Sequence, residues 1–221
     1  MKSKVVDVST AVSKIKDNDT ILFSGFYARG TAPDVIDEIL KQGQKDLTVA
    51  TNDGGWNDVG VGKLVSAGIV KKFICSWCGR TPIIPELDQK GELSLELVPQ
   101  GSLSERIRAG GFGLGGILTK AGLDTIIEEK WGKRINVNGE DWLYQTPIRG
   151  NVTVLEAWEA DEFGNLIFKN SQRNFSTVMA YASDIVIASV INPIVKAGSL
   201  DPDKIMIPGV IVDYIIQQKG V

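Results

Sequence analysis

The residues best suited to chemistry in this sequence lie in four short loops rich in glycine, amides and hydroxyls. Each loop follows a short apolar run of the kind expected for a buried strand. Ligands of parallel sheets gather beyond the carboxyl ends of the strands. Taken singly, each loop could be no more than a turn, but four on one expected edge favour a binding pocket rich in hydrogen-bond donors. The loops are 25–30 (GFYARG), 51–55 (TNDGG), 75–79 (CSWCG) and 99–101 (PQG).

Several familiar catalytic motifs are missing or out of context. The sequence has no histidine, which removes serine–histidine and cysteine–histidine catalysis and every histidine metal site. Segment 111–116 (GFGLGG) has G-x-G-x-x-G spacing, but it follows an expected helix, so the strand that a dinucleotide site requires is lacking. Cys75 and Cys78 form a C-x-x-C pair, which can be redox-active. Two cysteines alone do not make a zinc site, so we expect no metal and favour a pocket-lining or core role for both.

Composition narrows the class of protein further. The net charge of −3 argues against nucleic acid as a main partner, because no strong basic field attracts phosphates. No apolar run approaches the ~18 residues of a membrane span, and the first 19 residues mix lysine and aspartate, unlike a signal peptide. Two cysteines suit a reducing compartment. We therefore expect a cytoplasmic protein that is not bound to membranes.

Strand and helix patterns alternate along the first half of the chain and predict an α/β fold, with a mainly parallel sheet flanked by helices. Pro33 suits the first turn of a helix and Gly43 its end. Ser102 and Glu105 have the spacing of a capping box at a later helix start. Expected strands lie at 20–24, 47–50, 72–76, 93–98, 152–155 and 185–188, and expected helices at 8–15, 33–43, 61–67 and 102–109.

The middle of the chain departs from this alternation. Two alternating runs flank Asn138-Gly139, a strong hairpin turn signal, so we predict a small β-hairpin excursion across 134–145. No repeat, low-complexity segment or linker interrupts the sequence, and we interpret 1–221 as a single domain.

Five groups of motifs, in this order, resemble the α subunits of family I coenzyme A transferases, such as the acetate/butyrate–acetoacetate CoA transferases. The resemblance covers nearly the whole chain. Two departures from the family pattern are Ser24, where the family has glycine, and one extra residue between Gly30 and Pro33, next to Ala32. The segments are 17–33 (DNDTILFSGFYARGTAP), 51–62 (TNDGGWNDVGVG), 98–116 (VPQGSLSERIRAGGFGLGG), 164–166 (GNL) with 173–175 (RNF), and 207–209 (IPG).

The resemblance implies an enzyme whose active site is shared between two chains. In this family a glutamate of the β subunit, in a Glu-Asn-Gly or Glu-Ser-Gly setting, takes CoA as a thioester and passes it to a second acid in a ping-pong reaction. Neither tripeptide occurs in this sequence. The implied partner is therefore a β subunit, in a heterodimer or an α2β2 heterotetramer. CoA is implied as a substrate, with no permanently bound cofactor, and short-chain or 3-oxo acids such as acetate, butyrate and acetoacetate are the implied acids.

The same resemblance assigns roles to individual residues. Gln100 and Asn52 match family amides that donate hydrogen bonds to the reacting carbonyl oxygen, a catalytic role. The apolar, glycine-dense stretch 110–118 would be costly to expose, so we expect it to pack against the β subunit or line the CoA channel. Residues expected to bind substrate or CoA are Gly25, Phe26, Tyr27, Gly30, Asp53, Cys78 and Gly101. Residues expected at the interface or channel are Gly111, Phe112, Gly113, Gly115 and Gly116.

Two other functions remain as alternatives. A non-catalytic domain that binds CoA or another phosphorylated metabolite predicts binding by the isolated chain, with no need for a partner. A C-x-x-C redox protein predicts loss of function on Cys75→Ser or Cys78→Ser. A self-sufficient hydrolase is disfavoured, since the chain has no histidine base and no evident carboxylate pair.

Overall fold

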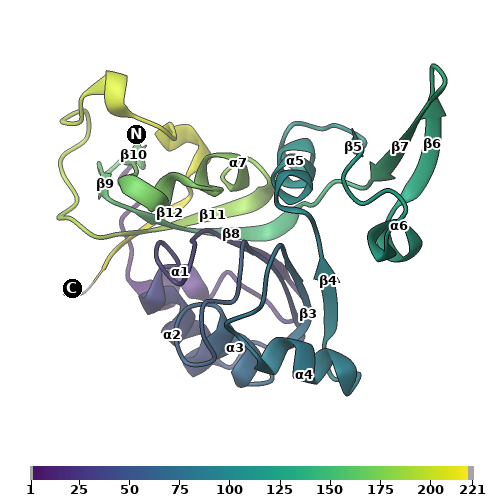
Figure 1. Cartoon of the computed structure of the whole chain (residues 1–221). Helices are drawn as coiled ribbons and strands as arrows, with labels where there is room; N and C mark the ends of the chain where they lie inside the picture. Colours follow the sequence, from purple (N-terminus) through teal and green to yellow (C-terminus); the bar gives the residue numbers. More distant parts are fainter. Residues whose placement is uncertain (1, 219–221) are drawn as a thin grey trace.

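A seven-stranded, fully parallel sheet forms the centre of the computed structural model, which describes residues 2–218 (Figure 1). The strand order is β12-β11-β8-β1-β2-β3-β4. This arrangement confirms the predicted α/β fold, and each of the six predicted strands is present. The strands are β1 Thr20–Phe23, β2 Leu47–Ala50, β3 Val70–Cys75, β4 Ser94–Leu97, β8 Gly150–Ala157, β11 Ser183–Val190 and β12 Tyr214–Gln217.

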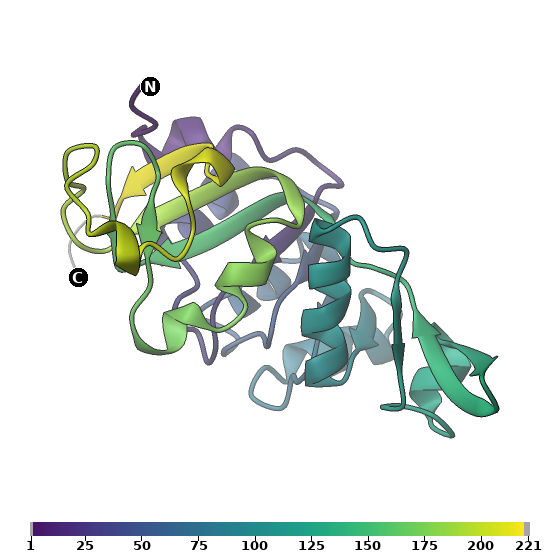
Figure 2. The same ribbon diagram turned by 90° about the horizontal axis from the view of Figure 1, so that it is seen from above.

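Helices cover both faces of this sheet (Figures 1 and 2). α1 to α4 lie on one face, while α5 and α7 lie on the other. Each strand therefore buries side chains on both sides, as apolar parallel strands do: Ile21 and Phe23 belong to one core and Leu22 to the other. The helices are α1 Val8–Val12, α2 Pro33–Gln42, α3 Gly62–Ser66, α4 Ile83–Gln89, α5 Gln100–Gly111 and α7 Ser176–Met179, with short 3-10 turns at η1 Asn170–Arg173, η2 Pro202–Lys204 and η3 Gly209–Ile211.

The strand order reverses at β1. This strand pairs with β2 on one side and β8 on the other, with Leu22 in register with both Ala50 and Thr153. A reversal of this kind opens a crevice beyond the carboxyl ends of the strands, where open α/β sheets bind ligands. The loops that follow β1, β2, β3 and β8 all emerge at this edge.

A projecting arm departs from the body after α5 (Figures 1 and 2). Its strands β5 Ile117–Thr119, β7 Glu140–Gln145 and β6 Lys133–Val137 pair antiparallel in that order, and α6 Ile126–Trp131 lies beside them. The predicted hairpin is confirmed, with Asn138 and Gly139 at φ 54° and 86° in the two-residue turn. Strand β5 was not predicted, because three residues are too few to show an alternating pattern.

Other features also differ from the sequence prediction, which did not include helices α6 and α7. Helix α5 begins at Gln100, so the predicted capping box at Ser102 is wrong: Ser102 lies inside the helix, and its buried hydroxyl has no partner within residues 2–218. Helix α4 was missed because Pro85 suggests a loop, yet proline is tolerated in a first turn. Edge strand β12 and the short pair β9 Glu159–Ala160 and β10 Leu166–Ile167 were also missed. None of the helices described between residues 2 and 218 has the length and apolar character to cross a membrane.

Candidate active site

The predicted donor-rich loops meet at the carboxyl ends of β1, β2 and β3 and the start of α5. They enclose a pocket of about 250 Å³. Five of the residues assigned from the sequence line it, together with Ser76 and Trp77, for which no role was assigned. The lining residues are Phe26, Tyr27, Asn52, Asp53, Ser76, Trp77 and Gln100.

The side-chain amide of Gln100 forms one hydrogen bond through its oxygen and one through its nitrogen. The Ser76 hydroxyl donates a hydrogen bond to Gln100 Oε1, and Gln100 Nε2 donates to Asn52 Oδ1 at 2.6 Å. A glutamine amide has two N–H hydrogens. Among the contacts within residues 2–218 this bond uses one, so the other is available to a ligand in the pocket.

Asn52 is bound more fully than Gln100. Its side chain is 1% exposed, and Nδ2 donates to the Gly25 carbonyl at 2.6 Å and to Asn174 Oδ1 at 3.2 Å. Both amide hydrogens therefore go to protein acceptors, while Oδ1 accepts from Gln100. In this geometry Asn52 ties three loops together and orients Gln100.

The loop after β1 is held in an unusual backbone conformation by Asp53. Tyr27 has φ 50°, in the left-handed region, and its backbone N–H donates to Asp53 Oδ2 at 3.1 Å. Gly55 N–H donates to Asp53 Oδ1 at 2.8 Å. Gly25 has φ 116°, and a Cβ there would overlap the Thr31 methyl group, so glycine is required.

Aromatic rings form one wall of the pocket. The Tyr27 ring centroid lies 4.5 Å from that of Phe26, 5.6 Å from Trp77 and 6.2 Å from Trp56. The Arg80 guanidinium lies 4.7 Å from the Tyr27 ring centroid. The sequence analysis assigned no role to Trp56, Trp77 or Arg80. Trp77 directly follows the predicted strand 72–76, and this position was the available signal.

The two cysteines lie behind this wall. Cys75 is buried and Cys78 is half-buried, packed against the core beneath α1 to α4, and neither lines the pocket. A hydrogen bond from the Cys75 thiol lowers the pKa of Cys78 to about 7, and the same bond together with burial raises the pKa of Cys75.

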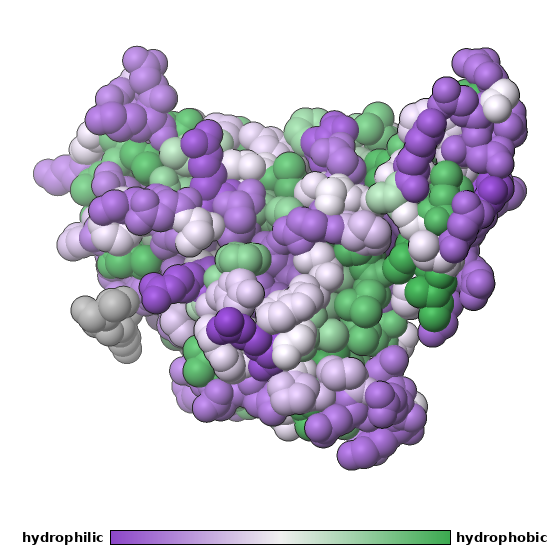
Figure 3. All heavy atoms as spheres, in the orientation of Figure 1, coloured by the Kyte–Doolittle hydropathy of each residue, from purple (hydrophilic) through white to green (hydrophobic). Residues whose placement is uncertain are grey.

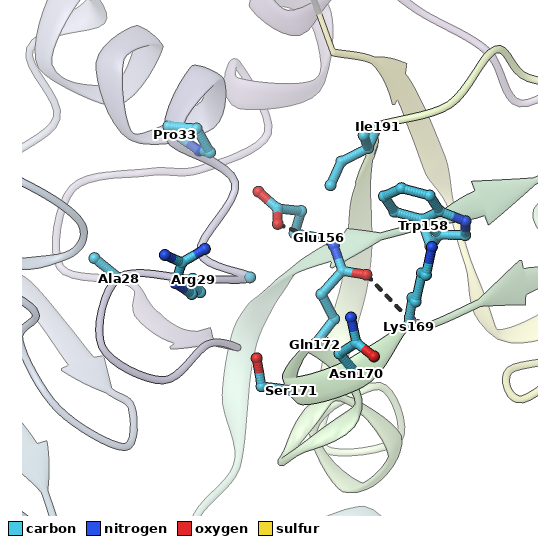
Figure 4. A pocket seen from close by; sticks show the side chains of 11 residues that line it. Ala28, Arg29, Pro33, Glu156, Trp158, Lys169, Asn170, Ser171, Gln172 and Ile191 are labelled. Carbon is cyan, nitrogen blue, oxygen red and sulfur yellow. Dashed lines mark hydrogen bonds between the residues drawn. The ribbon is translucent and has the colours of Figure 1, made fainter. Parts of the chain in front are cut away.

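A second pocket of about 310 Å³ lies on the other side of loop 25–30, at the end of β8 (Figure 4). Gly30 lines this pocket and not the first. Glu156 accepts hydrogen bonds from Gln172 Nε2 at 3.1 Å and from Gln218 Nε2 at 3.4 Å, one on each carboxylate oxygen. Lys169 Nζ lies 4.1 Å from the Trp158 ring centroid. These residues were missed, although Glu156 and Trp158 directly follow the predicted strand 152–155.

Comparison with known proteins decides the family. The family model for coenzyme A transferase matches residues 5–218. This chain belongs to the coenzyme A transferase family. The resemblance inferred from the sequence motifs is thereby confirmed.

Relatives of this coenzyme A transferase chain match it along nearly its whole length. It is 40% identical to the acetoacetyl-CoA:acetate/butyrate CoA transferase alpha subunit of Clostridium acetobutylicum over 218 residues, which cover 99% of each chain. It is 38% identical to one subunit of the 3-oxoadipate CoA-transferase of Acinetobacter baylyi over 212 residues, 95% of this chain and 92% of the relative.

The fold also matches solved structures. An acyl-CoA transferase from Escherichia coli O157:H7, solved as a thioester complex with CoA, superposes with a TM-score of 0.85 at 22% identity. The match covers 98% of this chain and 47% of the other, so this coenzyme A transferase chain spans about half the length of that protein.

The glycine-rich end of α5 in this transferase leads into the arm. Gly111 packs against Tyr181, and Phe112, 56% exposed, has its ring centroid 5.3 Å from that of Tyr181. Figure 3 shows apolar side chains gathered on the body beside the arm. Gly101 and Gly116 line a hollow between α5 and the arm, and a Cβ at position 116 would meet the backbone of β7, while positions 113 and 115 are open.

Helix α5 is fixed to the sheet by a buried ion pair. Arg106 Nη1 lies 2.6 Å from Glu96 Oε1 and Arg106 Nε donates to the Thr146 carbonyl at 2.7 Å, while Lys72 Nζ lies 2.7 Å from Glu96 Oε2. Burial alone would raise the pKa of Glu96, but hydrogen bonds from Lys72 and Arg106 hold it below its ordinary value. The ion pair thus secures the helix that begins at Gln100.

Proposed function

We propose that this chain supplies half of the active site of a CoA transferase, which moves CoA between an acyl-CoA and a short-chain carboxylic or 3-oxo acid. One observation carries the proposal: Gln100 is held by Ser76 and Asn52 with one N–H directed to a pocket that offers no unengaged carboxylate among its described lining residues. Asp53 lines the pocket, but each of its oxygens accepts a backbone N–H.

The nucleophile in this proposal is a glutamate carboxylate of the partner β subunit. It attacks the thioester carbonyl, and the tetrahedral intermediate collapses to a mixed anhydride and CoA thiolate. The thiolate then attacks the glutamyl carbonyl, which releases the first acid as its carboxylate and leaves a glutamyl-CoA thioester. The second acid repeats these steps in reverse, so the kinetics are ping-pong.

Gln100 acts on the charge that develops in each of these steps. Its available N–H donates to the oxyanion of the tetrahedral intermediate, where one preorganised donor contributes about 3–4 kcal/mol. Ser76 and Asn52 hold the amide in place before the reaction, so little reorganisation is needed. Gly25 and Phe26 bring the backbone of loop 25–30 to the same pocket.

The partner in this proposal covers the arm side of the chain. The Clostridium acetobutylicum relative is named as an alpha subunit, and the Acinetobacter baylyi relative is also named as a subunit, which supports a second kind of chain in the assembly. Leu114 and Leu118 are 47% and 45% exposed beside Phe112, an apolar surface that favours burial against a partner. We place the β subunit on this surface and on segment 111–116, in a heterodimer or an α2β2 heterotetramer. A cytoplasmic location is supported by the two free thiols.

The test is transferase activity after this chain is mixed with the product of its neighbouring gene, using acetoacetate and a panel of acyl-CoAs. Each chain alone is the control. Activity only in the mixture, and its loss on borohydride treatment in the presence of acyl-CoA, are expected. An inactive mixture, with CoA bound by this chain alone, would favour the binding-domain alternative.

A further inference from the structure

We propose that Asp53 makes this pocket select acyl groups that carry no second carboxylate. The inference rests on the proposed function, because it takes the pocket beside Gln100 as the place where the acyl chain lies. Of the seven lining residues that the structure describes, Asp53 alone carries a charge, and that charge is negative.

Asp53 cannot turn away from an occupant of the pocket. It is 6% exposed, and its two oxygens are fixed by Tyr27 N–H at 3.1 Å and Gly55 N–H at 2.8 Å. It directly follows Asn52, which orients the proposed oxyanion donor. An acyl chain that extends from Gln100 therefore runs past a fixed carboxylate.

The aromatic wall strengthens this effect. Phe26, Tyr27 and Trp77 line the pocket and present their ring surfaces to an acyl chain. A methyl or methylene end gains from contact with these rings. A second carboxylate would lose part of its water and face a like charge in the same pocket. At an effective dielectric of ~20 and a separation of about 6 Å, such a repulsion lowers binding by roughly 100-fold.

Overall sequence similarity does not distinguish an enzyme for monocarboxylic acids from one for dicarboxylic acids. The Clostridium acetobutylicum relative is named for acetate and butyrate, and the Acinetobacter baylyi relative for 3-oxoadipate, a dicarboxylic acid. The chain is 40% and 38% identical to them, and these values are too close to indicate which class of acid it uses. The charge of the pocket lining does indicate a class.

Arg80 carries a positive charge, which would favour an acyl group with a second carboxylate if it faced the acyl chain. Its guanidinium lies 4.7 Å from the Tyr27 ring centroid and 5.7 Å from that of Trp56, and it is not among the residues that line the pocket. In this arrangement Arg80 braces the aromatic wall from outside the acyl site. Its replacement therefore belongs in the test.

The experiment compares butyryl-CoA with succinyl-CoA, two four-carbon acyl donors, in the assembled wild-type enzyme with acetoacetate as acceptor. We expect kcat/KM to be about 100-fold higher for butyryl-CoA. In Asp53→Asn this ratio should fall at least tenfold through a gain with succinyl-CoA, and in Arg80→Ala it should not fall.

The outcomes separate this inference from the proposed function. The role of Asp53 would be overturned if the wild type used the two donors equally. It would also be overturned if the wild type preferred succinyl-CoA and Arg80→Ala abolished that preference. In both cases the proposed transferase function would stand. No transfer from any acyl-CoA would overturn the proposed function and this inference with it. The wild-type ratio needs no variant, so it tests the inference even if the Asp53→Asn protein misfolds.

Discussion

The two pockets on either side of loop 25–30 each contain a glutamine and a carboxylate but differ in how these side chains are engaged. Beside β2 and β3, Gln100 uses one of its amide hydrogens within the described chain and keeps the other for a ligand. Beside β8, each oxygen of Glu156 already accepts an amide hydrogen from Gln172 or Gln218. Chemistry is expected where a polar group is fixed but still has hydrogen-bonding capacity. A buried carboxylate that is held on both oxygens mainly contributes to stability.

The strongest test of this difference is Gln100→Ala in the assembled enzyme. We expect kcat to fall 100- to 1000-fold, because the variant loses a donor to the oxyanion. Steady-state kinetics with a good acyl-CoA measure the effect. A decrease below about tenfold would remove Gln100 from this role. Gln172→Ala, which removes a glutamine from the other pocket, is the matched control and should leave kcat within about threefold.

A buried carboxylate with a charged partner on each oxygen should instead affect stability, and Glu96→Gln tests this. We expect the variant to lose about 3 kcal/mol of unfolding free energy at pH 7, because Arg106 is left buried without its charge partner. The pKa of Glu96 lies below its ordinary value of 4.5, so its contribution is present above that pH and is lost as the pH falls further. Urea unfolding at pH 7 and pH 4 should show the difference between wild type and variant beginning to narrow in acid, by up to about 1 kcal/mol. A constant difference would contradict the assignment.

The cysteine pair behind the aromatic wall gives a smaller, pH-dependent effect. With its pKa at about 7, Cys78 should react with iodoacetamide roughly tenfold faster at pH 8 than at pH 6, in proportion to its thiolate. A thiol at the ordinary value of 9.0 would show roughly a 90-fold difference. Mass spectrometry of the alkylated peptide distinguishes the two, and buried Cys75 serves as the unreactive internal control.

The smallest expected effect is that of Glu156→Gln. Since both carboxylate oxygens are already bonded and the residue lies outside the Gln100 pocket, kcat should stay within about threefold. A loss of more than 100-fold, together with loss of borohydride trapping, would instead make Glu156 the nucleophile. That result would reverse the contrast between the two pockets.

Local signals in the sequence predicted much of the fold. Pro33 and Gly43 mark the start and the C-terminal cap of α2, and Asn138-Gly139 marks the hairpin turn. The meeting of the four loops also followed from the sequence, because parallel strands place their carboxyl ends on one edge. These features depend on residues close together in the chain, where the steric preferences of single residues decide the conformation.

Features that depend on distant contacts were not predictable in this way. The engagement of Asn52 requires the Gly25 carbonyl and Asn174, which no local pattern connects to it. Glu156 is paired by Gln218, 62 positions away. Helix α5 starts two residues before the apparent capping box, since Gln100 is drawn into the first turn by contacts with Ser76 and Asn52. These hydrogen-bond partners and this helix boundary are set by tertiary packing and not by the propensities of single residues.

Helix α5 connects the Gln100 pocket to the arm. It is a single rod of 12 residues, about 18 Å long, with Gln100 at its first turn and the arm attached beyond Gly111. The Glu96–Arg106 ion pair anchors this helix to the sheet part-way along. A chain bound to the arm would therefore contact one end of a rigid element whose other end carries the positioned Gln100 amide, so the docking surface and the donor keep a fixed separation.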